Sequence, residues 1–141
     1  ELRDLVRQAL RMRPDRLVVG EVRGAEVVDL LAALNTGHDG GCGTIHANSA
    51  SDVPARFEAL ALTAGLPREA LHAQLVAGLD LVVHVRRDRQ GRRVVDHVGV
   101  LQAGPDRLAD CVPALVLGPD QVREGPAHEA LRAVLGRGRR P

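Results

Sequence analysis

Glu21 is the first candidate for chemistry in this sequence, because it directly follows the apolar run Leu17-Val18-Val19-Gly20. Consecutive apolar residues with β-branched side chains favour a strand buried on both faces, as in a parallel sheet. The carboxylate would then lie at the carboxyl edge of the sheet, where open α/β sheets bind ligands. There it can hold Mg²⁺ through water, or orient a water that attacks a γ-phosphate. Gly20 leaves space for a ligand. The simpler alternative is that Glu21 only pairs with Arg23 at a strand end.

The second candidate is a histidine in the passage Thr36-Gly-His-Asp-Gly-Gly-Cys-Gly-Thr-Ile-His-Ala-Asn-Ser49. Its four glycines predict a flexible loop, and residues 43–46 are expected to form a short strand. If that strand neighbours the first one, His46 shares a sheet edge with Glu21. Its ring N–H can donate to a phosphate oxygen, and Asn48 is expected to orient the ring.

Two other interpretations of this passage stay open. In one, His38 and His46 only bind backbone carbonyls of a capped loop. In the other, His38, Cys42 and His46, evenly spaced by four, bind Zn²⁺. The glycines argue against a helix that would align these three ligands, because each glycine costs about 1 kcal/mol relative to alanine. A fourth ligand is missing unless Cys111 comes close.

The elements that must position these residues follow from hydrophobic periodicity and from proline and glycine signals. We expect helices at 2–13, 25–35, from 51 or 52 to 64, and 67–79, strands at 16–20 and 43–46, an antiparallel hairpin at 80–102, and a short helix near 127–135. This order predicts an α/β fold with a mostly parallel sheet plus the hairpin. Residues 1–103 are expected to form the core, and residues 104–141, rich in proline and glycine, a partly flexible C-terminal extension.

The composition narrows the class of protein. With 141 residues, 45% of them hydrophobic and 26% charged, the chain is long enough for one globular domain. Phe57 is its only aromatic residue, which argues against single-stranded nucleic acid stacked on aromatic side chains. The sequence contains no lysine, so a phosphate-binding loop of the form GxxxxGKS/T is not present in it. Cys42 and Cys111 are too few for a disulfide framework and are expected to be reduced thiols of a cytosolic protein.

Arginines cluster in two places although the formal net charge is only +1. The clusters are Arg86, Arg87, Arg89, Arg92 and Arg93 in the expected hairpin, and Arg137, Arg139 and Arg140 at the end. Such a run is typical of a solvated turn, here partly balanced by Asp88 and Asp96. A DNA-binding domain that uses these clusters is the alternative, and it predicts binding that falls steeply with salt. With so low a net charge, no nucleic-acid partner is expected.

Three runs together carry a resemblance to a known family. They are Arg11-Met-Arg-Pro-Asp-Arg-Leu-Val-Val-Gly-Glu-Val-Arg-Gly24, Asn35-Thr-Gly-His-Asp-Gly-Gly41 and Gly43-Thr-Ile-His-Ala-Asn-Ser49. In this order they resemble the type II/IV secretion ATPase superfamily, and within it the tight-adherence (Tad) pilus and conjugal-transfer-associated branch. The resemblance extends from about Leu2 to Arg87.

The resemblance implies a RecA-like P-loop NTPase core, of which this chain is the C-terminal part, and a site for ATP and Mg²⁺. Residues 16–24 correspond to the Walker B segment and 43–49 to the histidine box. Glu21 then acts near Mg²⁺, which it holds through water, and near the attacking water, and His46 senses the γ-phosphate. The neighbouring residues expected to contact the nucleotide are Gly20, Arg23, Thr44 and Asn48.

The resemblance also implies partners and a place in the cell. Family members form cytoplasmic hexameric rings at the inner face of the cytoplasmic membrane, where ATP-driven motions power pilus assembly or export through membrane platform proteins. Their phosphate-binding loop and acidic aspartate box lie N-terminal to the matched region, so Glu21 is expected to be a supporting acid. The chain begins inside an expected helix without Met, and we expect a piece of a longer protein that does not hydrolyse ATP alone. The alternative is a non-catalytic module that packs into a ring with full-length subunits.

Overall fold

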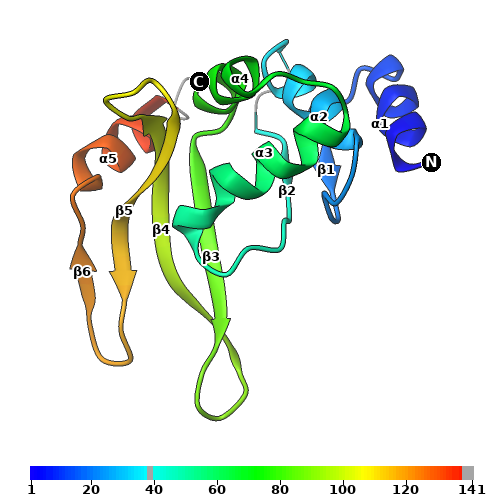
Figure 1. Ribbon diagram of the computed structural model, residues 1–141. Helices are drawn as coiled ribbons and strands as arrows, with labels where there is room; N and C mark the ends of the chain where they lie inside the picture. Colours follow the sequence, from blue (N-terminus) through cyan, green and yellow to red (C-terminus); the bar gives the residue numbers. More distant parts are fainter. Residues whose placement is uncertain (38–39, 138–141) are drawn as a thin grey trace.

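Helices and strands alternate along the first half of the chain (Figure 1). The computed structural model describes residues 1–37 and 40–137. The elements in order are α1 (Leu2–Arg11), β1 (Val18–Val19), α2 (Glu26–Leu34), β2 (Cys42–Gly43), the 3-10 turn η1 (Ala50–Asp52), α3 (Val53–Thr63) and α4 (Arg68–Gly78). This order agrees with the prediction, and the helix ends differ from it by no more than a few residues.

Strands β1 and β2 pair in parallel, with Val18 opposite Cys42 and Val19 opposite Gly43. Both strands are shorter than predicted, and β2 shares only Gly43 with the strand predicted at 43–46. The expectation that β1 is buried on both faces is wrong, because Val19 is buried while Val18 is 70% exposed. Neighbouring residues of a strand point to opposite faces, and among the described residues only the face with Val19 packs into the core.

The larger sheet is antiparallel, with strand order β3-β4-β5-β6. Its strands are β3 (Leu81–Arg87), β4 (Arg93–Ala103), β5 (Ala109–Leu117) and β6 (Val122–Glu124), and helix α5 (His128–Arg137) packs against β4 and β5 (Figure 1). The predicted hairpin is present as β3 and β4. The α/β class with parallel and antiparallel pairing is confirmed. The sheet was predicted to be mostly parallel, but among the described residues the antiparallel sheet has four strands and the parallel one has two.

Strands β5 and β6 lie in the segment that was expected to be a partly flexible extension. Pro113 and the surrounding glycines and prolines argue for a loop, since proline cannot donate to a ladder inside a sheet. The structure places Pro113 opposite Gly99, where the register between β4 and β5 shifts. Such a bulge tolerates proline. The Pro113 carbonyl accepts the N–H of Ala127 at 3.0 Å, which ties the start of α5 to the sheet.

One hydrophobic core joins the two halves of the chain. It contains side chains from α1 to α4 and from β1, and it continues into β4 and β5 through Leu101, Ala109 and Cys111. A smaller cluster of Val100, Ala114, Ala127 and Leu131 lies between the sheet and α5. In the described part of the chain, no helix is long and apolar enough to cross a lipid bilayer.

The buried His72 of α4 adds a polar link within this core. Its Nδ1 accepts the backbone N–H of Ala109 at 2.9 Å, and its Nε2 lies 3.1 Å from the carboxylate of Glu58 on α3. Because Nδ1 accepts, the ring proton is on Nε2, which donates to Glu58. His72 therefore holds α3, α4 and the start of β5 together.

Candidate functional site

Glu21 and His46 meet where the two parallel strands end. Oε1 of Glu21 lies 3.2 Å from Nε2 of His46. Glu21 follows β1 and His46 follows β2, so the parallel pairing brings their side chains to the same edge, as the sequence predicts. The side chains are 41% and 87% exposed, respectively, and are open to solvent. Among the described residues Glu21 makes no ion pair with Arg23, so that simpler alternative is not what the structure has.

Backbone contacts extend the strand pairing up to this pair. The N–H of Cys42 donates to the carbonyl of Leu17 at 2.9 Å, and that of Val22 donates to the carbonyl of Thr44 at 2.8 Å. The Thr44 hydroxyl donates to the Gly20 carbonyl. Thr44 was predicted to contact the nucleotide. In this structure its hydroxyl ties the two strand ends together.

The two glycines at this edge differ in their surroundings. A Cβ on Gly43 would lie 3.3 Å from the Val19 carbonyl oxygen, so the close approach of the strands favours glycine there. A Cβ on Gly20 would meet no heavy atom within 4 Å. Packing therefore does not require a glycine at position 20, and the space beside Glu21 is open.

Glu26, at the start of α2, was missed by the sequence analysis. Its buried carboxylate accepts the backbone N–H groups of Arg23 and Gly24, at 2.7 and 2.9 Å. Burial by itself raises the pKa of Glu26, but these backbone donors outweigh it and the pKa is lowered. Glu26 thus holds the turn that follows Glu21 in one conformation. An acid in the first turn of a helix was the available signal, because it also stabilises the helix dipole.

Arg23 and Asn48 both lie exposed near the edge. Asn48 shares a shallow pocket with His46, Asp52 and Arg56. No hydrogen bond joins Asn48 to His46 in the part of the chain that the structure describes, so Asn48 does not orient the ring here. Whether either residue contacts a nucleotide stays a prediction.

A cavity of about 330 Å³ runs from this edge to strand β3. Thr44 and His46 line one side of it, and His84 lies on the other side. Most of its remaining lining is apolar and comes from α2, α3 and β3, including Leu30, Phe57 and Leu81. The cavity is thus lined by residues from both sheets and from two helices, and its polar residues are Thr44, His46 and His84.

The zinc interpretation of the glycine-rich loop gains no support. His38 lies outside the described residues. Cys42 is exposed on β2, whereas Cys111 is buried in the core, where burial raises the pKa of its thiol to about 11. Among residues 1–37 and 40–137, one group of side chains has metal-ligand proximity, and it contains neither cysteine.

Several arginines of the hairpin are engaged by neighbours. Arg92 pairs with Asp88 at 2.8 Å, Arg87 donates to the Gly91 carbonyl at 2.8 Å, and Arg86 pairs with Asp96. Hydrogen bonds from His97 and Arg86 lower the pKa of the Asp96 carboxyl. These contacts are those of a solvated, self-paired turn.

The family comparison decides the identity of the chain. The family model described as type II/IV secretion system protein matches residues 1–110. The chain belongs to this family. The resemblance inferred from the three sequence runs is therefore confirmed at the level of the type II/IV secretion ATPase superfamily, and the matched region includes both Glu21 and His46.

Individual members of the type II/IV secretion family agree. A putative conjugal transfer protein of Mycobacterium tuberculosis is 64% identical over 107 residues, which cover 76% of this chain and 30% of that protein. The probable conjugal transfer protein TrbB of Sinorhizobium fredii is 44% identical over 96 residues, 68% of this chain and 29% of that protein. The chain thus spans about a third of the length of the curated relatives it matches.

A solved structure of the type II/IV secretion family shows the same fold. The VirB11 ATPase of the Brucella suis type IV secretion system, determined in complex with sulphate, matches with a TM-score of 0.65 and 29% identity. The match covers 71% of this chain and 32% of that one. The family is thus one of secretion motors, and this chain has the fold of the corresponding part of such an ATPase.

Proposed function

We propose that this chain supplies the acid and the phosphate sensor of the ATP site of a secretion motor. The observation that carries the proposal is the contact of Glu21 with His46 at the carboxyl ends of two parallel strands. An exposed carboxylate and an exposed imidazole side by side suit a ligand that brings both a divalent cation and an anionic phosphate.

The residues at this edge fit one side of a complex of Mg²⁺ and ATP. Glu21 would hold Mg²⁺ through water, and His46 would donate from its ring to a γ-phosphate oxygen. Arg23 and Asn48 are exposed nearby, and Gly20 leaves open space. Bound Mg²⁺ would neutralise phosphate charge during hydrolysis. The chain's own part is to place an acid and a proton donor side by side at one edge of the site.

The phosphate-binding loop has to be supplied by residues outside this sequence. The sequence has no lysine and hence no phosphate-binding loop of the usual form. We propose that this loop and the main general base lie in other parts of the complete protein, so the chain alone does not hydrolyse ATP. The complete protein would form a hexameric ring at the cytoplasmic face of the membrane, bind platform proteins, and drive Tad pilus assembly, conjugal transfer or export.

Phosphate release by the isolated chain and by the complete protein tests the proposal. The complete protein is expected to hydrolyse ATP, and Glu21→Gln or His46→Ala to lower the rate by about a hundredfold or more. Asp80→Asn is the control, because Asp80 is exposed and pairs only with Arg137 among the described residues. If the isolated chain hydrolyses ATP and Glu21→Gln abolishes this activity, the proposal that the site needs residues outside this chain is overturned.

A second candidate function is a non-catalytic assembly module. Apolar side chains are exposed on the uncovered face of β1 and along the hairpin, namely Val18, Val83, Val85 and Val95. Val85 lies opposite Val95 in the β3–β4 ladder, and exposed apolar side chains grouped as these two are occur at protein interfaces. Light scattering after size exclusion separates the two functions. Binding of the chain to full-length ATPase subunits that is the same for the unaltered chain and for the Glu21→Gln and His46→Ala variants favours assembly. A chain that stays a monomer and has no affinity for these subunits excludes it.

A further inference from the structure

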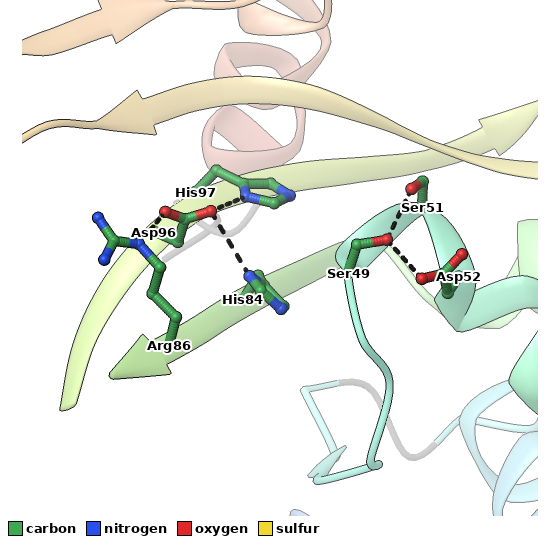
Figure 2. A network of polar contacts seen from close by, with 7 residues as sticks. All are labelled: Ser49, Ser51, Asp52, His84, Arg86, Asp96 and His97. Carbon is green, nitrogen blue, oxygen red and sulfur yellow. Dashed lines mark hydrogen bonds and ion pairs between the residues drawn. The ribbon is translucent and has the colours of Figure 1, made fainter. Parts of the chain in front are cut away.

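The hairpin of β3 and β4 brings two histidines and an aspartate to one face of the sheet. His84 of β3 lies directly opposite His97 of β4, and the next pair is Val85 with Val95. Asp96 is therefore the extra residue of a β-bulge. Neighbouring residues of a regular strand point to opposite faces, but a bulge re-aims a side chain. Asp96 consequently lies on the same side as both histidines (Figure 2).

The ligand atoms of the three side chains converge. Oδ2 of Asp96 lies 3.0 Å from Nδ1 of His97 and 3.6 Å from Nδ1 of His84. The two imidazole rings are 5.1 Å apart between centroids. In a tetrahedral site with bonds of about 2.0–2.1 Å, two ligand atoms lie about 3.3 Å apart. The two measured separations lie on either side of that value.

His84 is one of three described side chains that have a buried polar atom without a hydrogen-bond partner, and the other two are Gln74 and His128. Nδ1 of His84 is buried and has no hydrogen-bond partner among the described residues, because 3.6 Å to Asp96 is too long. A buried polar atom without a partner costs free energy. A cation between His84 and Asp96 would accept the lone pair of this nitrogen and remove the cost.

We propose that His84, Asp96 and His97 form a binding site for a divalent transition-metal ion, with Zn²⁺ as the best match. Two imidazole nitrogens and one carboxylate oxygen are a ligand set that Zn²⁺ accepts, with a fourth position for water. The side chains are 17%, 30% and 16% exposed, which holds them in place and leaves a path for the ion. None of these residues has a role in the proposed ATP site, although His84 lines the cavity that also reaches Thr44 and His46.

Arg86 supports the arrangement from outside the site. Its Nε donates to Oδ1 of Asp96, so the other oxygen, Oδ2, faces the histidines (Figure 2). A fixed carboxylate orientation is the usual contribution of groups around metal ligands. The 3-10 turn η1 lies against β3 on this side, where Ser49 bonds to Ser51 and Asp52 (Figure 2).

Titration of the tag-free chain with Zn²⁺ against a chromophoric chelator tests the site. One equivalent is expected to bind, and His84→Gln, Asp96→Asn and His97→Gln are each expected to weaken binding at least about tenfold. With Co²⁺ in place of Zn²⁺, the visible absorption of a four-coordinate ion is expected for the unaltered chain and is expected to be lost in each variant. Circular dichroism confirms that each variant is folded.

Two matched controls separate this site from other ligands. His128→Gln removes a histidine of α5 outside the cluster, and Cys42→Ser removes the exposed thiol. Both are expected to bind Zn²⁺ as the unaltered chain does. Equal affinity of the unaltered chain and the His84→Gln and Asp96→Asn variants would overturn the proposal, as would loss of binding in Cys42→Ser alone. If a glutamine variant fails to fold, the Co²⁺ spectrum of Asp96→Asn decides.

Discussion

The carboxylate of Glu21 faces Nε2 of His46 at 3.2 Å, so the residues that follow the two parallel strands are in side-chain contact. Under the proposed function, a bound γ-phosphate takes the place of this carboxylate beside the imidazole. The contact joins two solvent-exposed side chains and holds the ring only weakly before the nucleotide binds.

Glu21→Gln in the complete protein is therefore expected to keep ATP binding while losing hydrolysis. The neutral amide removes repulsion between the carboxylate and the phosphates, so the Kd for ATP is expected to stay within about threefold or to fall. His46→Ala is expected to weaken ATP binding, because a donor to the phosphate is lost. Titration with a fluorescent ATP analogue measures both, and a Glu21→Gln protein that binds ATP tenfold more weakly contradicts the assigned roles.

Replacement of His72 is expected to lower the free energy of unfolding by about 1–3 kcal/mol, because His72→Ala leaves the buried N–H of Ala109 without an acceptor. Urea denaturation followed by circular dichroism measures the change. His46→Ala is the matched control, since that ring is exposed and is expected to alter stability by no more than about 0.5 kcal/mol. Equal stability of the His72 and His46 variants would show that the hydrogen bond from Ala109 to His72 contributes nothing to the free energy of unfolding.

Asp29 is expected to make the docking of α1 on α2 sensitive to acid. Its carboxylate accepts Arg3 Nε at 2.6 Å and Arg7 Nε at 2.8 Å. Burial alone raises the pKa of Asp29, but the two guanidinium groups outweigh it and lower the pKa. The folded state therefore binds this proton less readily than the unfolded state, and the stabilisation is present above the unfolded pKa of about 4 and lost as pH falls below it.

Asp29→Asn tests this pH dependence. At pH 7 the free energy of unfolding of the variant is expected to be about 1–2 kcal/mol lower than that of the unaltered chain. Between pH 7 and pH 3 this free energy is expected to fall less in the variant than in the unaltered chain. Thermal melts across that range provide the measurement. Parallel pH profiles for the two proteins would mean that other carboxylates carry the acid sensitivity.

The two thiols are expected to differ strongly in reactivity. Cys42 is exposed on β2, while Cys111 is buried and burial raises the pKa of its thiol to about 11. Because the thiolate is the reactive form, an aromatic disulfide reagent is expected to modify one equivalent rapidly at pH 8 and the second only in denaturant. Cys42→Ser is expected to remove the rapid phase. A rapid phase that persists in Cys42→Ser would place Cys111 at the surface.

Local patterns in the sequence determined much of the candidate site. The apolar run before Glu21 predicts its strand, and the glycine-rich passage predicts a loop that leads to His46. The order of helices and strands follows from periodicity and from proline and glycine positions. These signals are short-range. They place Glu21 and His46 each at the end of its own strand, but they do not determine which strands and side chains meet in space.

Tertiary structure alone decided which residues meet. The exposure of Val18 depends on what covers each face of β1, and the strand that contains Pro113 exists because a bulge opposite Gly99 accepts it. The cluster of His84, Asp96 and His97 likewise requires the bulge in the β3–β4 register, since a regular ladder would turn Asp96 to the other face. Register and bulges depend on long-range pairing and packing, which no window of the sequence contains.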